Sequence, residues 1–316
     1  MGTVLITGVA GFIGSHLSER LLARGETVVG VDNFDPFYDR AVKQRNLEGS
    51  RAGDAFTFVE ADICDAEKMQ AVFAEHAPDA VVHIAALAGV RPSIERPGDY
   101  MRVNVDGTTS LLEAAAKHGS PKFIFASSSS VYGNNTKIPF SEDDPVDHPI
   151  SPYAATKRAC ELLAHSIHHI WGMSVWCLRF FTVYGPRQRP DLAIHKFARR
   201  ILAGQPIQMY GDGSASRDYT YVDDVVAGIR RALERCRGYE IVNLGSTRPI
   251  ALSEMIRTVA EACGREPVIE RLPMQPGDVD RTFADVSKAA RLLDYAPATD
   301  FRVGVERFVS WVKAHP

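Results

Sequence analysis

Short apolar runs alternate with amphipathic stretches along most of the chain. Runs rich in Val, Ile, Leu and Phe predict strands at 3–7, 27–32, 56–60, 80–84, 122–126, 175–180 and 240–244. Helical periodicity lies between them, at 15–22, 66–76, 104–118 and 149–170. The run 80–84 is apolar at nearly every position, which is typical of a parallel strand buried on both faces. The pattern predicts an α/β fold with a doubly wound parallel sheet.

A glycine-rich turn after the first strand carries the first candidate chemistry. Gly8, Gly11 and Gly14 lead from the strand into the helix, so the backbone can bend tightly and approach a pyrophosphate at the helix N-terminus. The second strand ends at Asp32, whose carboxylate can accept hydrogen bonds from an adenosine ribose and would repel a 2′-phosphate. The turn and the spaced acid together predict binding of NAD rather than NADP.

Three further candidates follow the later strands. Asp62 ends the third strand, where it can either contact an adenine amino group or cap the helix 66–76. Small residues, Ala85 and Ala86 among them, follow the fourth strand and suit the close passage of a cofactor. Asn104 lies among aliphatic residues of the next helix, where it can brace the active-site backbone or make a polar contact between helices.

Composition limits the partners that need to be considered. The chain has 316 residues, of which 45% are hydrophobic and 24% charged, and its net charge of −3 indicates neither a nucleic acid nor an anionic membrane as partner. Met1 is followed almost at once by the first strand, and no apolar run approaches the ~20 residues that span a bilayer. The five scattered cysteines indicate reduced thiols. We therefore expect a cytoplasmic protein.

The fifth strand opens into the serine run 127–130, and a tyrosine and a lysine follow on the next helix. Tyr153 and Lys157 are four residues apart and so share one helix face. A nearby ammonium favours the phenolate and lowers the tyrosine pKa, which makes Tyr153 a usable base. A hydroxyl of the run, that of Ser128 or Ser130, can hold the substrate oxygen against the phenol.

The motifs Gly-x-x-Gly-x-x-Gly, Asp32, Ser-Ser-Ser-Ser-Val-Tyr-Gly and Tyr-x-x-x-Lys together resemble the extended short-chain dehydrogenases/reductases. More narrowly, the chain is similar to the NAD-dependent nucleotide-sugar epimerases and dehydratases. The resemblance implies a Rossmann NAD-binding domain at 1–180, to whose sheet 225–247 returns, and a smaller α/β nucleotide-sugar-binding lobe at 181–316. It also implies a homodimer formed through the helices that carry Asn104 and Tyr153. The cofactor-binding residues that it implies are Gly8, Gly11, Phe12, Ile13, Gly14, Asp32, Asn33, Asp62, Ile63, Ala85, Ala86, Asn104, Tyr153 and Lys157.

The same resemblance implies contacts to a UDP-sugar in the second lobe. The segment 213–224, with Arg217, matches the family's diphosphate-binding segment, and 275–278 matches its uridine-side loop, whose acid is Asp278. The loop 185–193 resembles that of the UDP-glucuronate 4-epimerases. The full set of substrate candidates is Arg91, Ser128, Thr182, Arg187, Arg189, Lys196, Arg217 and Asp278.

The group on C6 of the sugar is the point at which these enzymes differ. Thr182 stands where glucose/galactose epimerases usually have asparagine, and two arginines follow within the loop. A carboxylate on C6 calls for a cation that a neutral CH2OH does not need. Thr182 and Arg189 are therefore expected to hold a glucuronate carboxylate, with Arg187 the weaker candidate. The alternative is that both arginines bind phosphate or face solvent.

The residues beside Ser128 discriminate between the reactions of the family. The dehydratases that the chain resembles have an Asp-Glu pair there, whereas this chain has Ser129 and Ser130, so elimination lacks its general acid. The expected reaction is NAD-dependent C4 epimerisation of UDP-glucuronate to UDP-galacturonate through a 4-keto intermediate. The alternatives are a UDP-glucose 4-epimerase, another nucleotide-sugar dehydratase or decarboxylase, and a non-catalytic NAD-binding regulator. Loss of Tyr153 or Lys157 would mark the regulator, and both are present.

Two other kinds of site are disfavoured. His165, His168 and His169 lie close together on one helix, but no acid or cysteine at ligand spacing joins them, so no metal is expected. The serine run lacks the Gly-x-Ser-x-Gly elbow of a hydrolase nucleophile.

Overall fold

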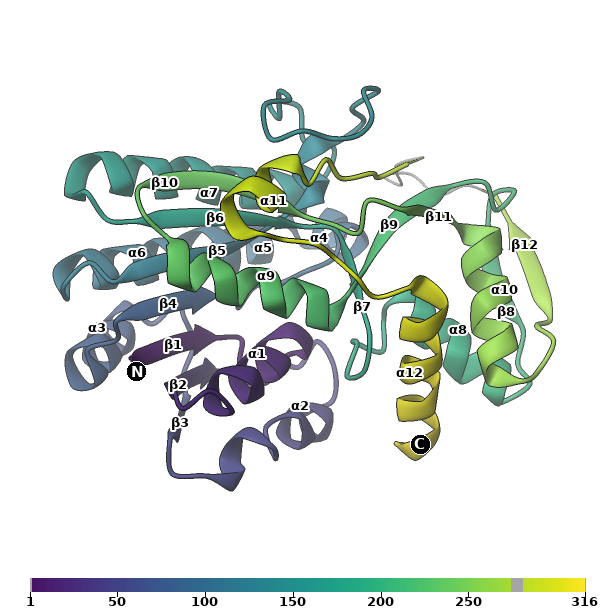
Figure 1. Cartoon of the computed structure of the whole chain (residues 1–316), viewed down its shortest axis with the longest axis horizontal. Coiled ribbons are helices and arrows are strands. Elements are labelled where there is room, and N and C mark those ends of the chain that lie inside the picture. Colours follow the sequence, from purple (N-terminus) through teal and green to yellow (C-terminus); the bar gives the residue numbers. More distant parts are fainter. Residues whose placement is uncertain (1, 274–280, 316) are drawn as a thin grey trace.

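A parallel sheet forms the centre of the computed structural model (Figure 1). The structure describes residues 2–273 and 281–315, and in these residues seven parallel strands make up that sheet in the order β10-β6-β5-β4-β1-β2-β3. They are β1 (Thr3–Thr7), β2 (Thr27–Asp32), β3 (Phe56–Glu60), β4 (Ala80–His83), β5 (Lys122–Ser128), β6 (Val175–Phe180) and β10 (Tyr239–Leu244). The strand order reverses between β1 and β4, where doubly wound sheets bind ligands at the carboxyl ends of their strands. The predicted fold class is confirmed.

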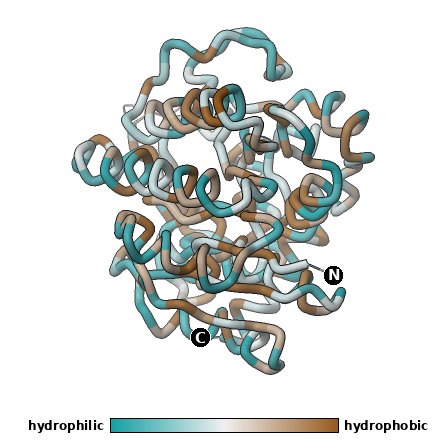
Figure 2. Tube along the Cα trace, turned by 90° about the vertical axis from the view of Figure 1, so that its left-hand side faces the viewer, coloured by the Kyte–Doolittle hydropathy of each residue, from teal (hydrophilic) through white to brown (hydrophobic). Residues whose placement is uncertain are grey.

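Helices cover both faces of the sheet because successive strand residues point to opposite sides. Val4 and Ile6 belong to a core under α1 (Phe12–Leu22) and α9 (Val222–Arg235). Leu5 belongs to the other core, under α3 (Ala66–His76), α6 (Gly107–Lys117) and α7 (Pro152–Trp171). Along the helices in Figure 2, brown and teal segments alternate turn by turn, as expected for helices that bury one face.

The helix predicted at 104–118 forms as two consecutive segments, η2 (Met101–Asp106) and α6, and two short helices precede it. The short helices are α4 (Val90–Glu95) and α5 (Pro97–Tyr100), and η2 is π-helical. The π segment carries Asn104, whose side chain accepts from the backbone N–H of Leu87 (2.8 Å) and donates to its carbonyl (3.0 Å). The Asn104 amide also donates to the hydroxyl of Thr156 (3.0 Å). Asn104 therefore joins the turn after β4 to α7.

The smaller lobe lies at the right of Figure 1. Its strands are β7 (Thr182–Tyr184), β9 (Ser216–Tyr221) and β11 (Pro249–Ala251) in one sheet, and β8 (Ile207–Tyr210) and β12 (Ile269–Leu272) in another. Its helices are α8 (Ala193–Leu202), α10 (Leu252–Cys263) and α12 (Phe301–Ala314). Between β9 and β11 the chain passes through α9 to β10, which pairs with β6 in the main sheet. The lobe and the sheet are therefore interleaved along the sequence.

The remaining elements are short. They are α2 (Arg40–Asn46), α11 (Ser287–Leu293) and the 3-10 turns η1 (Ser50–Ala52) and η3 (Ser129–Tyr132). Among residues 2–273 and 281–315, no helix combines the length and the apolarity needed to cross a membrane.

Candidate active site

The glycine-rich turn packs directly against the first turn of α1. Gly8 has a φ of +73°, in the left-handed region that favours glycine. A Cβ on Gly14 would lie 2.2 Å from the carbonyl oxygen of Gly8, so no side chain fits there. Gly11 precedes α1 and supplies no side-chain cap, which leaves the first N–H groups of the helix available to an anion. The turn therefore fits the pyrophosphate of a dinucleotide.

A cavity of about 170 Å³ opens at this turn, at the carboxyl ends of β1 to β4. The predicted cofactor residues that line it are Gly8, Gly11, Asp32, Asn33, Asp62, Ile63, Ala85 and Ala86. Phe12 instead lies in the core, with Ile13 packed against it, and Gly14 supports the turn from behind. Asn104 braces the cavity wall through Leu87, which is one of the lining residues.

Asp32 ends β2 beside this cavity and is held by the backbone. Its carboxylate accepts hydrogen bonds from the N–H groups of Ala10 (3.0 Å) and Phe34 (2.9 Å). Burial raises the pKa of Asp32, while these two hydrogen bonds and the ammonium of Lys43 oppose that shift. The carboxylate is thus oriented at the place where a ribose of the dinucleotide would lie.

Asp62 does not cap the helix that follows it, which was one of its two expected roles. The cap of α3 is Asp65, whose carboxylate accepts from the N–H of Lys68 (2.9 Å). Asp62 instead accepts from the N–H of Cys64 (2.8 Å) and from the side chain of Asn33 (3.3 Å). Its second predicted role, a contact to the adenine, stays a prediction.

Lys157 is buried where α7 packs against the end of β5. Its Nζ donates to the carbonyl of Ala126 (2.8 Å) and lies 5.9 Å from the centroid of the Tyr153 ring. Burial lowers the pKa of Lys157 to about 8, while Cys160 and Glu161 oppose that shift. The ammonium therefore faces the phenol across one helical turn, as the spacing predicted.

The pKa of Tyr153 moves in the direction opposite to the sequence expectation. Burial raises it, and this effect outweighs both the hydrogen bond from Ser128 and the field of Arg189, which lower it. The sequence expectation considered only the lysine charge and not the removal of water from the phenol. Tyr153 therefore needs further positive charge in its pocket for its phenolate to form near neutral pH.

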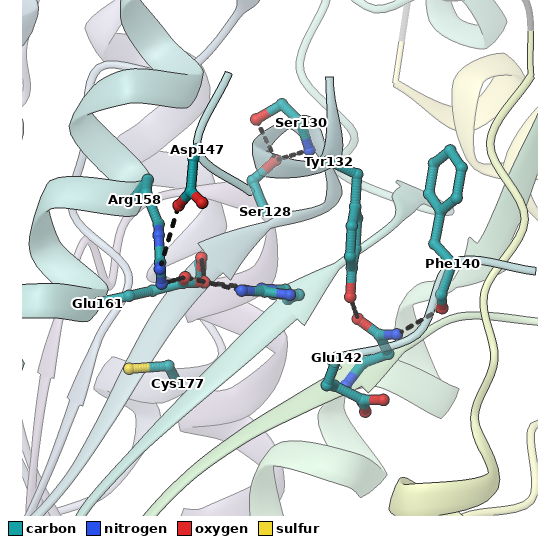
Figure 3. A network of polar contacts seen from close by, with 12 residues as sticks. Ser128, Ser130, Tyr132, Phe140, Glu142, Asp147, Arg158, Glu161 and Cys177 are labelled. Carbon is teal, nitrogen blue, oxygen red and sulfur yellow. Dashed lines mark hydrogen bonds and ion pairs between the residues drawn. The ribbon is translucent and has the colours of Figure 1, made fainter. Parts of the chain in front are cut away.

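The hydroxyls of the serine run make two separate sets of contacts, and Figure 3 shows the one between Ser128 and Ser130. The hydroxyl of Ser128 accepts from both the N–H (3.2 Å) and the hydroxyl (2.9 Å) of Ser130, and bonds to the phenol of Tyr153. The hydroxyl of Ser127 points away from them and donates to Glu161 (2.6 Å). Ser128 and Ser130 are therefore the pair next to the phenol.

A larger cleft, of about 1460 Å³, lies between the smaller lobe and a wall formed by α1, α2 and α4. The predicted substrate residues that line it are Arg91, Thr182, Arg187, Lys196 and Arg217. Thr182 and Tyr219 face each other in register on the paired strands β7 and β9. The guanidinium of Arg91 lies 5.2 Å from the centroid of the Tyr210 ring. The cations of this cleft suit an anionic ligand such as a diphosphate.

The two arginines of the loop 185–193 point to different places. Arg187 donates to the carboxylate of Glu19 on α1 (2.8 Å). Arg189 lines the small cavity, where its guanidinium lies 4.9 Å from the centroid of the Phe37 ring and binds both oxygens of Asp191 (3.0 and 2.7 Å). Of the two, Arg189 is the one whose charge lowers the pKa of Tyr153.

Sequence reasoning missed two charged residues here. Lys43 lines the small cavity and donates to the carbonyl of Asp35 (2.6 Å), and Asp191 holds Arg189. No motif indicates Lys43, because α2 follows a long connection after β2 and its position beside the cavity depends on the fold. Asp191 could have been found from its spacing, since it is two residues after Arg189 in the same loop.

Asp278 lies outside the described residues. Within 2–273 and 281–315, no group of three His, Cys, Asp or Glu side chains could hold a metal ion.

Comparisons with known proteins agree with this geometry. Residues 4–245 match the model of the NAD dependent epimerase/dehydratase family. The UDP-glucuronate 4-epimerase of Thermodesulfobacterium geofontis is 41% identical over 314 residues, which cover 99% of this chain and 97% of the relative. The crystal structure of UDP-glucuronic acid 4-epimerase from Bacillus cereus, in complex with UDP-glucuronic acid and NAD, is similar with a TM-score of 0.94 at 36% identity, over 99% of each chain. A UDP-glucose 4-epimerase from Thermotoga maritima with UDP-glucose reaches 0.90 at 34% identity, also over 99% of each chain.

Proposed function

Since this chain belongs to the NAD-dependent epimerase/dehydratase family, we propose that it interconverts UDP-glucuronate and UDP-galacturonate by NAD-dependent epimerisation at C4. The observation that carries the substrate assignment is the place of Arg189, whose charge reaches Tyr153. C4 of the sugar must meet the base, and the carboxyl group is attached to C5, the next ring atom. A cation beside the base therefore suits a hexuronate.

NAD is proposed to bind along the small cavity and the turn beside it. The uncapped N-terminus of α1 suits the pyrophosphate, and Asp32 suits an unphosphorylated adenosine ribose. When bound, the oxidised nicotinamide supplies a hydride acceptor for C4 and a positively charged ring. The residues that would hold the cofactor are the eight predicted ones that line the cavity, together with Tyr153 and Lys157. Phe12, Ile13, Gly14 and Asn104 act as supports behind the cavity.

Tyr153 is the proposed base that removes the proton from the C4 hydroxyl. Ser128 and Ser130 are the proposed partners of that hydroxyl: they are hydrogen-bonded to each other, and Ser128 also bonds to the phenol. Lys157 places a positive charge 5.9 Å from the centroid of the phenol ring. Ser128 and Arg189 oppose the effect of burial on the pKa of Tyr153. After C4 has lost its hydride, the 4-keto sugar turns over in the cleft and receives the hydride on its other face. The proton on Tyr153 then returns to the oxygen.

The carboxylate of the sugar is the proposed ligand of Arg189 and Thr182. Oxidation at C4 makes a β-keto acid, which readily loses CO2, so an epimerase must hold this group while the ring turns. Arg187 is the weaker candidate, because its guanidinium is paired with Glu19.

The nucleotide is proposed to occupy the larger cleft. Arg217 on β9 is the candidate for the diphosphate, with Arg91 and Lys196 lining the same space. Asp278 remains the proposed partner of the uridine ribose.

We also propose that the protein is a cytoplasmic homodimer. Support for the dimer comes from large apolar side chains that are at least 48% exposed on neighbouring helices: Ile94, Met101, Leu162, Ile170 and Trp171. The helices α7 and α6 pack side by side, and α7 also contacts α4 and η2. A second copy that covers these side chains would bury the patch.

The decisive experiment is NMR of the products formed from a panel of UDP-sugars that includes UDP-glucuronate and UDP-glucose. We expect UDP-galacturonate from UDP-glucuronate with no NADH released, because the hydride leaves and returns within one turnover. Turnover of UDP-glucose alone would establish the glucose epimerase instead. Stoichiometric NADH would indicate a dehydrogenase, and binding of NAD without any turnover would indicate a regulator.

A further inference from the structure

Helix α7 presents a third polar residue toward the end of β5. Tyr153, Lys157 and Glu161 follow one another at intervals of four residues, so their side chains lie on one helix face. The first two contact the strand end at Ser128 and Ala126. Glu161 continues this pattern one turn further along the helix.

Glu161 is fully buried and ties two strands to the helix. One of its oxygens accepts from the hydroxyl of Ser127 on β5 (2.6 Å) and from Nε of Arg179 on β6 (2.9 Å). The other accepts from Nη2 of Arg179 (2.9 Å) and, nearer the surface, from Nη1 of Arg158 (3.2 Å). Ser127 and Arg179 are partners in the sheet register, so the carboxylate bridges β5 and β6.

Tyr132 extends these contacts under the serine run. Its ring centroid lies 4.8 Å from the guanidinium carbon of Arg179, and its hydroxyl donates to the side chain of Asn243 on β10 (2.7 Å). The Asn243 amide in turn donates to the carbonyl of Phe140 (2.9 Å). Figure 3 shows this set of contacts running below Ser128 from Glu161 to Phe140.

We infer that Glu161 is a positioning residue for the proposed epimerase reaction, because its bonds to Ser127 and Arg179 fix the end of β5 against α7. This inference rests on the function proposed above. Glu161 touches neither cavity; it sets the depth at which the neighbouring Ser128 meets the phenol of Tyr153. A role in stability alone explains the buried ion pair between Glu161 and Arg179 poorly, since apolar residues of similar volume often replace such a pair without loss of stability.

Glu161 also supplies negative charge beside Lys157. The titratable groups that face Lys157 are Tyr153, Cys160 and Glu161 on its own helix, His83 on β4 and Cys177 on β6. Burial lowers the pKa of His83 to about 3 and raises the pKa of each of these two thiols, so these three groups are neutral near pH 7. Glu161 is thus the carboxylate in this set, and it favours the charged form of Lys157.

Three variants test the inference. Glu161→Gln with Arg179→Met removes the pair without leaving a buried unpaired charge, and Ser127→Ala removes only the bond to β5. Arg158→Gln is the matched control, because Arg158 binds the same carboxylate from the partly exposed side. Each protein is measured for thermal unfolding, for kcat and KM over a range of pH, and for ionisation of Tyr153 by difference absorbance against Tyr153→Phe.

We expect the double variant to fold and to lose roughly ten- to a hundredfold in kcat, while its KM changes less than about threefold. Its kcat should start to fall at a lower pH than in the wild type, and Tyr153 should ionise at a higher pH. Ser127→Ala should lose a smaller factor in kcat, and Arg158→Gln should stay within about twofold of the wild type.

A stable double variant with wild-type kcat and pH profile would overturn the inference. If the double variant fails to fold, Ser127→Ala decides, and an unchanged kcat there would likewise overturn it. A wild type that epimerises only UDP-glucose would refute the substrate proposal alone, because Glu161 acts at C4 and not at C6.

Discussion

Replacement of Arg189 by alanine is the most direct test of the substrate assignment. Its guanidinium lies at the small cavity, and its charge lowers the pKa of Tyr153. If a hexuronate binds with C4 against this phenol, its carboxylate is one ring atom away and within the field of Arg189. The substitution should therefore weaken transition-state binding of UDP-glucuronate much more than that of UDP-glucose.

The size of the effect follows from the contacts that are lost. One charge-assisted hydrogen bond contributes about 1.5–3 kcal/mol, and each 1.4 kcal/mol is about a factor of ten in kcat/KM. Arg189 already makes two contacts to Asp191, so the substrate must compete with that carboxylate. We therefore expect a loss near the lower end of the range, roughly ten- to thirtyfold in kcat/KM.

The assay is NMR of the products, with UDP-glucuronate and UDP-glucose as parallel substrates. A carboxylate that is no longer held can align with the C4 carbonyl and leave as CO2, so the share of UDP-pentose should rise in Arg189→Ala. Thr182→Ala should show the same change to a smaller extent. Arg187→Ala is the comparison variant, because its guanidinium is paired with Glu19 and it is the weaker candidate for the carboxylate.

Equal losses on both sugars would refute this reasoning. They would assign Arg189 to the cofactor or the diphosphate, which both substrates share, and the glucose epimerase would become the favoured function. A larger loss of kcat/KM for Arg187→Ala than for Arg189→Ala would indicate that the sugar carboxylate binds Arg187 instead.

Four further predictions follow from the site. Fluorescence titration should show NAD binding much more tightly than NADP, and Asp32→Ser should narrow that preference, whereas equal affinities in the wild type would contradict the role of Asp32. Tyr153→Phe should still bind NAD, and its kcat should fall about 10²–10⁴-fold, which is the usual contribution of a general base. A variant that keeps a substantial part of the wild-type rate would show that another residue is the base. The pKa of Lys157 is lowered to about 8, so kcat/KM should fall as the pH rises through this value and the ammonium is lost; a flat profile up to pH 10 would contradict the requirement for charge. Stability should change in the opposite direction, rising from about pH 8 toward the ordinary lysine value of 10.5, because the unfolded chain then binds the additional proton.

Local patterns were enough to predict the sheet and the main chemical groups. The strands at 3–7 and 27–32 lie where their apolar runs predicted, because a strand that is buried on both faces needs apolar side chains at nearly every position. Tyr153 and Lys157 share a helix face because four residues make about one helical turn. The turn at Gly8 needs glycine for a backbone conformation that other residues rarely adopt. Each of these constraints acts over a few neighbouring residues, so it can be read without the fold.

Tertiary structure decided the features that depend on distant segments. The π segment at Asn104 has no periodicity of its own and is held by bonds to Leu87 and Thr156. The direction of the Tyr153 pKa shift follows from the water that folding removes, which the spacing to Lys157 does not report. Arg187 and Arg189 are two residues apart and equivalent in sequence, yet Arg187 faces Glu19 and Arg189 faces the small cavity. Their difference arises because the loop between β7 and α8 passes α1, where Arg187 meets Glu19, and the small cavity, where Arg189 lies; that path depends on packing between residues far apart in the chain.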